Sequence, residues 1–225
     1  MRDSEEVKTI SDGPRFIVVE GPIGVGKTSL AKRLSQSFAS ELILEGADEN
    51  PFLERFYRNK RQAALPTQLY FLLQRAQQIE HLRQRDLFSP VRVADFLIEK
   101  DRLFAELNLD AMELNLYNEV ASKLELDPPK PDLVVYLQAP ANVLLQRIAR
   151  RGIDHEQYID ANYLERLGDA YAQFFHNYNE APLLIVNAAS IDPVNRESDY
   201  EELLGTIMSV KRGRHFFNPA LQSIS

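Results

Sequence analysis

Residues 21–28 carry the clearest chemical pattern in this chain of 225 residues. A glycine, four further residues and Gly-Lys-Thr follow one another there, which is the spacing of a loop that binds nucleotide phosphates. Glycines let the backbone come close to the phosphates, so that several N–H groups can point at the anion. Lys27 is expected to reach the β- and γ-phosphates, and the Thr28 hydroxyl to bind Mg²⁺. The predicted ATP-binding residues are Gly21, Ile23, Gly24, Val25, Gly26, Lys27, Thr28 and Ser29.

The segments on either side of this loop are the ones that such a loop requires. Residues 15–20 form a short apolar run typical of a buried strand, and apolar residues then recur every four positions from Leu30, as in a helix. Further strand-like runs lie at 41–45, 91–95, 132–138 and 183–187, and long helical patterns separate them. The sequence therefore predicts an α/β fold in which a five-stranded parallel sheet, flanked by helices, carries the phosphate-binding loop (P-loop).

The predicted catalytic domain spans residues 15–205 and lies between two terminal segments. Residues 1–14 are polar and charged and predict a flexible tail. Residues 206–225 predict a helix end followed by a basic, aromatic tail that is solvated or docked. Two long helices, one marked by the apolar residues of 69–82 and one expected over 98–124, carry more apolar residues than one face requires, which favours a homodimer.

The composition excludes several classes of protein. A net charge of −7 argues against a nucleic-acid partner, and no apolar run is long enough to span a membrane. The chain has no cysteine and its four histidines are scattered, so neither thiolates nor a histidine cluster can hold a metal. Since the N-terminus also lacks a signal pattern, we expect a soluble, cytoplasmic protein.

Charged residues at two strand ends and in one later helix could supply the chemistry of phosphoryl transfer. Glu45 and Asp95 end the second and third strand-like runs, where ligands bind in open parallel sheets. They could act as a base and a metal contact, or merely cap the next helix. Arg147 and Arg151 lie four residues apart, so they share a helix face within a predicted lid at 147–158. They could clamp phosphates, or form an ordinary solvated stripe.

The phosphate loop alone does not decide among the nucleotide-binding classes. The chain has no Asn-Lys-x-Asp motif of the kind that reads guanine in GTPases. Its size, acidic balance and long helices favour a small-molecule kinase, which needs a carboxylate near the acceptor hydroxyl, cations on a mobile segment and a pocket that excludes water.

At this point the sequence resembles the deoxynucleoside kinase family, and within it the bacterial purine kinases. The resemblance covers residues 15–205. The segments that carry it are the loop at 20–28, Glu-Asn-Pro-Phe-Leu-Glu-Arg-Phe-Tyr at 49–57, Gln-Leu-Tyr-Phe-Leu-Leu-Gln-Arg at 68–75, Asp-Arg-Leu-Phe-Ala at 101–105, and Arg-Ile-Ala-Arg-Arg-Gly at 147–152 with Glu156. The order and spacing of these segments, rather than any one of them, are specific. The resemblance implies ATP-dependent phosphorylation of a deoxynucleoside 5′-hydroxyl in nucleotide salvage.

The resemblance also implies a role for individual residues. Glu45 corresponds to the acid that contacts the 5′-hydroxyl, and Tyr57 and Glu156 to the pair that binds the 3′-hydroxyl. The implied base-site residues are Gln68, which reads the base edge, Arg75 and Asp101, which line the pocket, and Phe104, which stacks on the base. Arg147 and Arg151 correspond to lid arginines on the phosphates, and residues 192–196 to a loop around the adenine of ATP. The predicted catalytic set is Glu45, Lys27, Arg147, Arg151 and Asp95.

The sequence departs from the family pattern in two places. Arg-Ser commonly follows the strand-end acid, whereas Phe96 and Leu97 follow Asp95 here, so an arginine near the 5′-oxygen is missing or is supplied elsewhere. A further lid arginine is replaced by Ile153, and Arg150 is a candidate to compensate. A nucleoside monophosphate kinase and a nucleotide-binding protein without activity remain alternatives, and deoxycytidine remains an alternative to a purine substrate.

Overall fold

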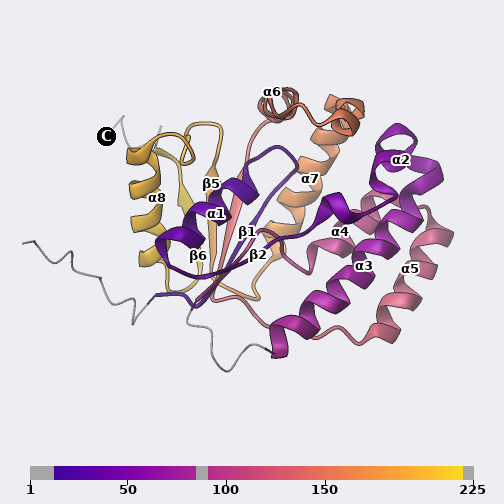
Figure 1. Ribbon diagram of the computed structural model, residues 1–225, viewed down its shortest axis with the longest axis horizontal. Helices are drawn as coiled ribbons and strands as arrows, with labels where there is room; N and C mark the ends of the chain where they lie inside the picture. Colours follow the sequence, from indigo (N-terminus) through magenta and orange to yellow (C-terminus); the bar gives the residue numbers. More distant parts are fainter. Residues whose placement is uncertain (1–12, 85–90, 220–225) are drawn as a thin grey trace, which may run out of the picture.

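The computed structural model describes residues 13–84 and 91–219. Six strands form one parallel sheet in the order β2-β3-β1-β4-β5-β6 (Figure 1). The strands are β1 (Phe16–Glu20), β2 (Glu41–Ile43), β3 (Arg92–Ala94), β4 (Leu133–Gln138), β5 (Leu183–Asn187) and β6 (Arg214–Phe217). The predicted α/β fold with a parallel sheet is confirmed, and each of the five expected strands is present. The central strands β1 and β4 are buried on both faces, which explains why they are continuous apolar runs.

The sixth strand was not predicted. It is formed by part of the basic, aromatic segment that we expected to be a tail, and it pairs in parallel with β5, with Phe217 opposite Val186. Phe217 is buried, and the Arg214 guanidinium donates to the carbonyl oxygens of Phe175 and His176, both at 2.9 Å. Arg214, His215 and Phe216 remain exposed, as is typical of an edge strand, and this masked the strand in the sequence.

Helices cover both faces of the sheet. Figure 1 shows α1 and α8 on one side of the strands, α3, α4 and α7 on the other side, and α6 at one end. The helices are α1 (Lys27–Ser37), α2 (Leu53–Arg58), α3 (Lys60–Gln84), α4 (Lys100–Asn108), α5 (Ala111–Leu124), α6 (Ala141–Arg151), α7 (Ala161–Asn177) and α8 (Glu197–Ser209), with short 3₁₀ turns η1 (Ala47–Glu49) and η2 (Asp154–Tyr158). Within the described residues, none of these helices combines the length and the apolar character needed to cross a bilayer.

The single helix expected over 98–124 is wrong, because the chain forms two helices there. Leu109 is extended and ends α4, and Asp110 then starts α5 through a capping box. The Asp110 carboxylate accepts the backbone N–H groups of Met112 and Glu113, both at 2.9 Å, and Glu113 accepts the backbone N–H of Asp110 at 3.1 Å. A helix start of this kind satisfies donors that would otherwise lack partners. The predicted flexible tail at 1–14 lies almost wholly outside the described residues.

Candidate active site

The phosphate-binding loop joins β1 to α1 and has a backbone that only glycines adopt without strain. Gly24 has φ +81°, and a Cβ atom added there would lie 2.8 Å from Ile148 Cγ1 and 3.1 Å from the Leu144 carbonyl oxygen. The loop therefore packs directly against α6, the helix that carries the predicted lid arginines. Gly26 has φ +106° with open space around its Cα, and it is the N-cap of α1.

The loop fits the phosphate groups of a nucleotide. Among the described residues, nothing accepts the backbone N–H groups of Gly24, Gly26 and Lys27, and all three are at or near the positive end of α1. The Lys27 ammonium donates to two loop carbonyls, at 2.7 Å to Gly21 and 3.4 Å to Pro22. Burial and the nearby Lys100 lower the pKa of Lys27 from its ordinary value. An anion bound in this loop would meet unpaired donors and a poorly solvated cation.

Asp95 connects the end of β3 to both the loop and the end of β2. Its Oδ2 accepts the Thr28 hydroxyl at 2.5 Å, and its Oδ1 accepts the backbone N–H of Glu45 at 2.7 Å. A hydroxyl beside a carboxylate offers the oxygen ligands that Mg²⁺ prefers, and this ion needs only one or two protein ligands when phosphates supply others. The two predicted strand-end acids thus lie together.

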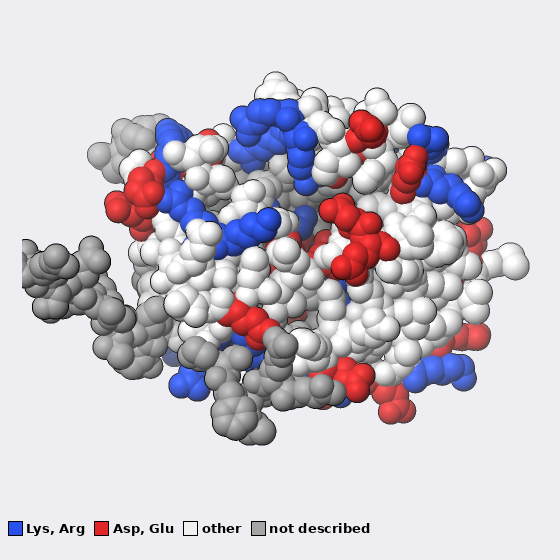
Figure 2. All heavy atoms as spheres, in the orientation of Figure 1, with Lys and Arg blue, Asp and Glu red and all other residues white. Residues whose placement is uncertain are grey.

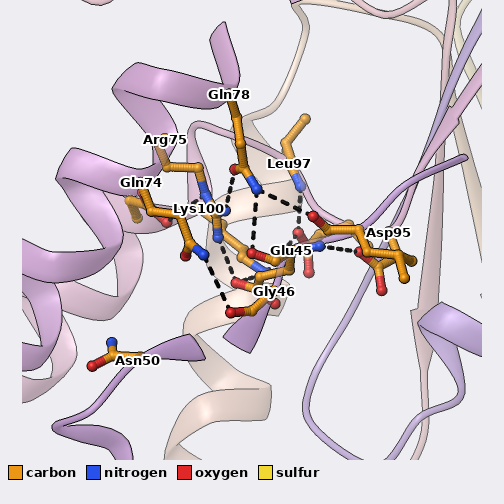
Figure 3. Close-up of polar contacts among 12 residues, drawn as sticks. Glu45, Gly46, Asn50, Gln74, Arg75, Gln78, Asp95, Leu97 and Lys100 are labelled. Atoms are coloured by element: carbon orange, nitrogen blue, oxygen red, sulfur yellow. Dashed lines mark hydrogen bonds and ion pairs between the residues drawn. The ribbon is translucent and has the colours of Figure 1, made fainter. Parts of the chain in front are cut away.

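Glu45 is held by two buried cations (Figure 3). Its Oε1 accepts Arg75 at 2.5 Å and Lys100 at 3.0 Å, and no described residue donates to its Oε2. Burial raises the pKa of Glu45, but Lys100, Arg75 and Lys27 together outweigh burial and bring the pKa to about 2. Gln78 fixes the backbone here by donating to the Leu44 carbonyl oxygen at 3.1 Å. Glu45 is therefore an ionised carboxylate with one oxygen available.

Lys100 was missed in the sequence analysis. It lies in the first turn of α4, near Glu45 and 3.4 Å from Glu20, which is itself completely buried. No local sequence pattern indicates a role for Lys100, because its partners Glu20 and Glu45 are more than 50 residues away in the chain. Only a model of how β1, β2 and α4 meet could have identified it.

A cavity of about 430 Å³ opens beside Glu45, on one side of the phosphate loop. Its size is within the range of small-molecule sites. The predicted substrate residues that line it are Glu45, Tyr57, Gln68, Asp101, Phe104 and Glu156, together with Lys27, Thr28 and Asp95. Arg75 does not line the cavity as expected. It is fully buried behind the wall, where it contacts Glu45 and stacks 4.2 Å from the Phe96 ring centre.

The end of the cavity near η2 holds the two residues expected to bind the sugar. Arg151 Nε donates to Glu156 Oε2 at 3.0 Å, so the lid arginine and the sugar-site acid are paired in this state. The Tyr57 ring stacks on His155 with 5.8 Å between centres, and burial raises the pKa of the Tyr57 hydroxyl well above its ordinary value. Tyr57 is therefore a neutral hydrogen-bonding group.

The lining also includes the residues expected to read the base. Gln68 and Asp101 are buried, and Phe104 packs edge-on against Tyr171 with 6.0 Å between ring centres. Asp101 Oδ2 has no hydrogen-bond partner among the described residues. Burial, opposed by Arg75, raises the pKa of Asp101 to about 6. A buried acceptor without a partner is costly, so this end is suited to a ligand that donates N–H groups.

A second cavity of about 770 Å³ lies on the other side of the loop, between α6 and residues 188–196. Ser29 and Arg151 line both cavities. Arg147 lines only this one, and its guanidinium donates to the carbonyl oxygens of Val25 at 3.0 Å and Ala188 at 2.7 Å. Figure 2 shows a hollow between two rims. Basic side chains lie along the rim near α6, and acidic side chains lie along the facing rim, near η1.

The fold and the site together define an α/β phosphotransferase of the P-loop class, with one cavity on either side of the phosphate loop. A sequence profile described as Deoxynucleoside kinase matches residues 17–210. The chain belongs to the deoxynucleoside kinase family. This confirms the predicted family and the predicted enzyme class.

Individual relatives agree with this assignment. A deoxyguanosine kinase of Bacillus subtilis is 37% identical over 194 residues, which cover 84% of this chain and 93% of the relative. A deoxyadenosine kinase of Lactobacillus acidophilus is 31% identical over 86% of this chain and 94% of the relative. The fold also matches the structure of deoxyadenosine kinase from M. mycoides with bound dATP, with a TM-score of 0.75, 24% identity, and coverage of 87% of this chain and 100% of that chain.

Proposed function

We propose that this enzyme transfers the γ-phosphoryl group of ATP to the 5′-hydroxyl of a purine deoxynucleoside. The observation that carries the proposal is the position of Glu45 at the wall of the 430 Å³ cavity, which we assign to the acceptor, across from Lys27 of the phosphate loop. No donor in the described part of the chain reaches its Oε2. An ionised carboxylate there can accept a hydrogen bond from a neutral alcohol. The purine preference is supported by the deoxyguanosine and deoxyadenosine kinases among the relatives.

Glu45 orients the acceptor hydroxyl more than it activates it in advance. Its pKa of about 2 makes it a weak base toward an alcohol. The proton therefore moves late, when the bond between the 5′-oxygen and phosphorus is forming and the bond to ADP is breaking. ADP leaves with the electrons of the broken bond, and Glu45 takes the proton.

The remaining residues bind the donor and balance its charge. The loop N–H groups and Lys27 hold the β- and γ-phosphates, and Arg151 reaches them once it leaves Glu156 for the donor side. Thr28 and Asp95 would hold Mg²⁺, which when bound neutralises phosphate charge. In this arrangement Glu156 and Tyr57 bind the sugar 3′-hydroxyl.

A nucleoside monophosphate kinase is the nearest alternative. Such an enzyme must accommodate a second phosphate where the acceptor oxygen lies, and Glu45 would repel it. The acids that line the acceptor cavity, which include Asp48, Asp95 and Asp101 besides Glu45, make that repulsion stronger.

A coupled assay of ADP release tests the proposal directly. The wild-type protein is given ATP and Mg²⁺ with each of the four deoxynucleosides and, in parallel, each of their 5′-monophosphates. We expect turnover with deoxyguanosine or deoxyadenosine and none above background with the monophosphates. Turnover only with a monophosphate would support the alternative reaction, and ATP binding without turnover on any acceptor would support a non-catalytic role.

We further propose that the enzyme works as a homodimer in the cytoplasm. Leu73 on α3, and Met112 and Leu116 on α5, are 50%, 83% and 46% exposed, which is unusual for side chains of this type on neighbouring helices. A second copy packed on these helices would cover them. The absence of cysteine suits a reducing compartment.

A further inference from the structure

Lys100 occupies a position where a lysine is unfavourable by itself. It is 3% exposed, and it is the first residue of α4, so its charge is removed from water and lies near the positive end of a helix. Glu20 and Glu45 offset both costs, and they raise the pKa of Lys100 even though burial lowers it. The ammonium is thus held charged inside the protein.

Glu20 does not depend on Lys100 for its hydrogen bonds. Its carboxylate accepts the backbone N–H groups of Gly21 at 2.7 Å and Leu97 at 2.6 Å, and the Tyr171 hydroxyl at 2.9 Å. The contact with Lys100 is longer, at 3.4 Å. The shorter contact of Lys100 is with Glu45 Oε1, at 3.0 Å. Lys100 therefore interacts more closely with Glu45 than with Glu20.

Among the described residues, no other cation both contacts Glu45 and lines the cavity. Arg75 also binds Oε1, but it is fully buried behind the wall. The two residues after Asp95 are Phe96 and Leu97, which are buried and apolar. Lys100 both contacts Glu45 and lines the cavity.

We propose that Lys100 is a positioning residue for phosphoryl transfer: it fixes Glu45 through Oε1, so that Oε2 faces the acceptor hydroxyl, and it places a positive charge at the acceptor end of the site. The inference rests on the proposed function and deepens it, because it assigns to α4 a charge that the residues after Asp95 do not provide. An arrangement fixed before the substrate binds requires little reorganisation during the reaction.

The test compares Lys100→Met, Lys100→Arg and wild type by steady-state kinetics with a purine deoxynucleoside and ATP. We expect Lys100→Met to lower kcat by roughly 10²-fold, the scale of removing one preorganised charged group, with little change in KM for ATP. Lys100→Arg should recover part of the loss, because it restores the charge. Arg102→Met, on the same helix but exposed and paired with Glu106, is the control and should match wild type.

A double variant separates this role from charge compensation of Glu20. Lys100→Met removes a cation that contacts both Glu20 and Glu45, and this loss could reduce folding. The double variant Glu20→Gln/Lys100→Met also removes the charge of Glu20, and it is compared with Glu20→Gln alone. We expect the double variant to fold and to remain impaired in kcat relative to Glu20→Gln. Equal kcat for these two variants would overturn the inference, as would wild-type kcat in Lys100→Met. Absence of turnover in the wild type would instead overturn the proposed function, and this inference with it.

Discussion

Glu45 is the residue on which the reaction depends, and its environment makes a specific prediction. Glu45→Gln keeps the size of the side chain but removes the charge that orients the hydroxyl and accepts its proton. We expect kcat to fall by roughly 10²- to 10⁴-fold, the range for loss of a general acid–base group, while ATP affinity is unchanged. Steady-state kinetics and nucleotide titration measure the two effects. Glu49→Gln, four residues further on, exposed and outside the cavity lining, is the matched control. A variant that retains wild-type kcat would remove Glu45 from the mechanism.

The raised pKa of Asp101 leads us to expect that kcat/KM for the deoxynucleoside depends on pH near neutrality. Its folded pKa of about 6 lies above the ordinary value of 3.8, so the carboxyl ionises as the pH rises through about 6 and only then accepts two hydrogen bonds from the base. We expect kcat/KM for the deoxynucleoside to rise from about pH 5 to about pH 7, with a midpoint near the Asp101 pKa of about 6. Asp101→Asn should abolish this step.

The same pKa shift also affects stability. Because the folded state binds the Asp101 proton more tightly than the unfolded chain, ionisation favours unfolding, and the free energy of unfolding should fall between about pH 4 and pH 6. Chemical denaturation across this range should show a smaller fall in Asp101→Asn. An identical pH profile in the two proteins would contradict the assigned pKa.

Tyr57 predicts discrimination at the sugar. The proposed 3′-hydroxyl site consists of Tyr57 and Glu156, and a substrate without that hydroxyl leaves buried groups unpaired. Wild type should therefore prefer a 2′-deoxynucleoside to its 2′,3′-dideoxy analogue, and Tyr57→Phe should narrow the ratio of their kcat/KM values. Phe56→Leu, the neighbouring buried aromatic that also lines the cavity, controls for loss of packing. Equal ratios in wild type and Tyr57→Phe would disprove the role.

At the residue level, the sequence predicts those site residues whose position follows from a local pattern. Glu45 and Asp95 could be proposed because parallel strands end at one edge, and the loop residues because their spacing is specific. Lys100 and the buried position of Arg75 could not, because both follow from charge pairing between distant elements rather than from a local pattern.

At the level of elements, the contact between the phosphate loop and α6 predicts that the loop and lid move together. Gly24→Ala would force a Cβ atom to within 2.8 Å of Ile148 Cγ1 at a φ of +81°. We expect it to destabilise the fold by about 1–3 kcal/mol and to raise KM for ATP, since either α6 or the loop must shift.

A second glycine provides the control for this substitution. Gly205 lies within α8 with open space around it and an ordinary φ, so Gly205→Ala should stabilise the protein by about 0.5–1 kcal/mol without changing KM. Thermal unfolding and ATP kinetics of both variants check the comparison. Unchanged ATP kinetics in Gly24→Ala would show that loop and lid are not coupled.

The elements that were predicted and those that were missed differ in a physical way. Five strands were predicted from short apolar runs, which are buried almost throughout in the central strands β1, β3 and β4. β6 was missed because it buries only one side chain, Phe217, and leaves Arg214, His215 and Phe216 exposed, so that it has no apolar run of its own. The boundary between α4 and α5 was missed because the apolar pattern runs on through Leu107, Leu109 and Met112, and the stop depends on the Asp110 cap.

At the level of the whole molecule, the outer face of α3 and α5 predicts the oligomeric state. Light scattering coupled to size exclusion should give the mass of a dimer for wild type. Leu73→Glu/Leu116→Glu should give a monomer, because a charge buried in an interface without a partner is costly. Phe216→Glu changes an apolar side chain on β6 that is still more exposed, and it should leave the dimer intact. A monomeric wild type would disprove the interface.

The strand order has a consequence for how the enzyme is made. β1 comes first in the sequence but lies at the centre of the sheet between β3 and β4, and its Phe16 amide is bonded to Asp132, 116 residues away. While the chain is still on the ribosome, β1 cannot pair, because β3 and β4 have not yet been synthesised. Pairings this distant in sequence slow folding and leave apolar segments exposed to other chains. The phosphate loop therefore acquires its shape late, and during refolding the capacity to bind nucleotide should be among the last properties to return.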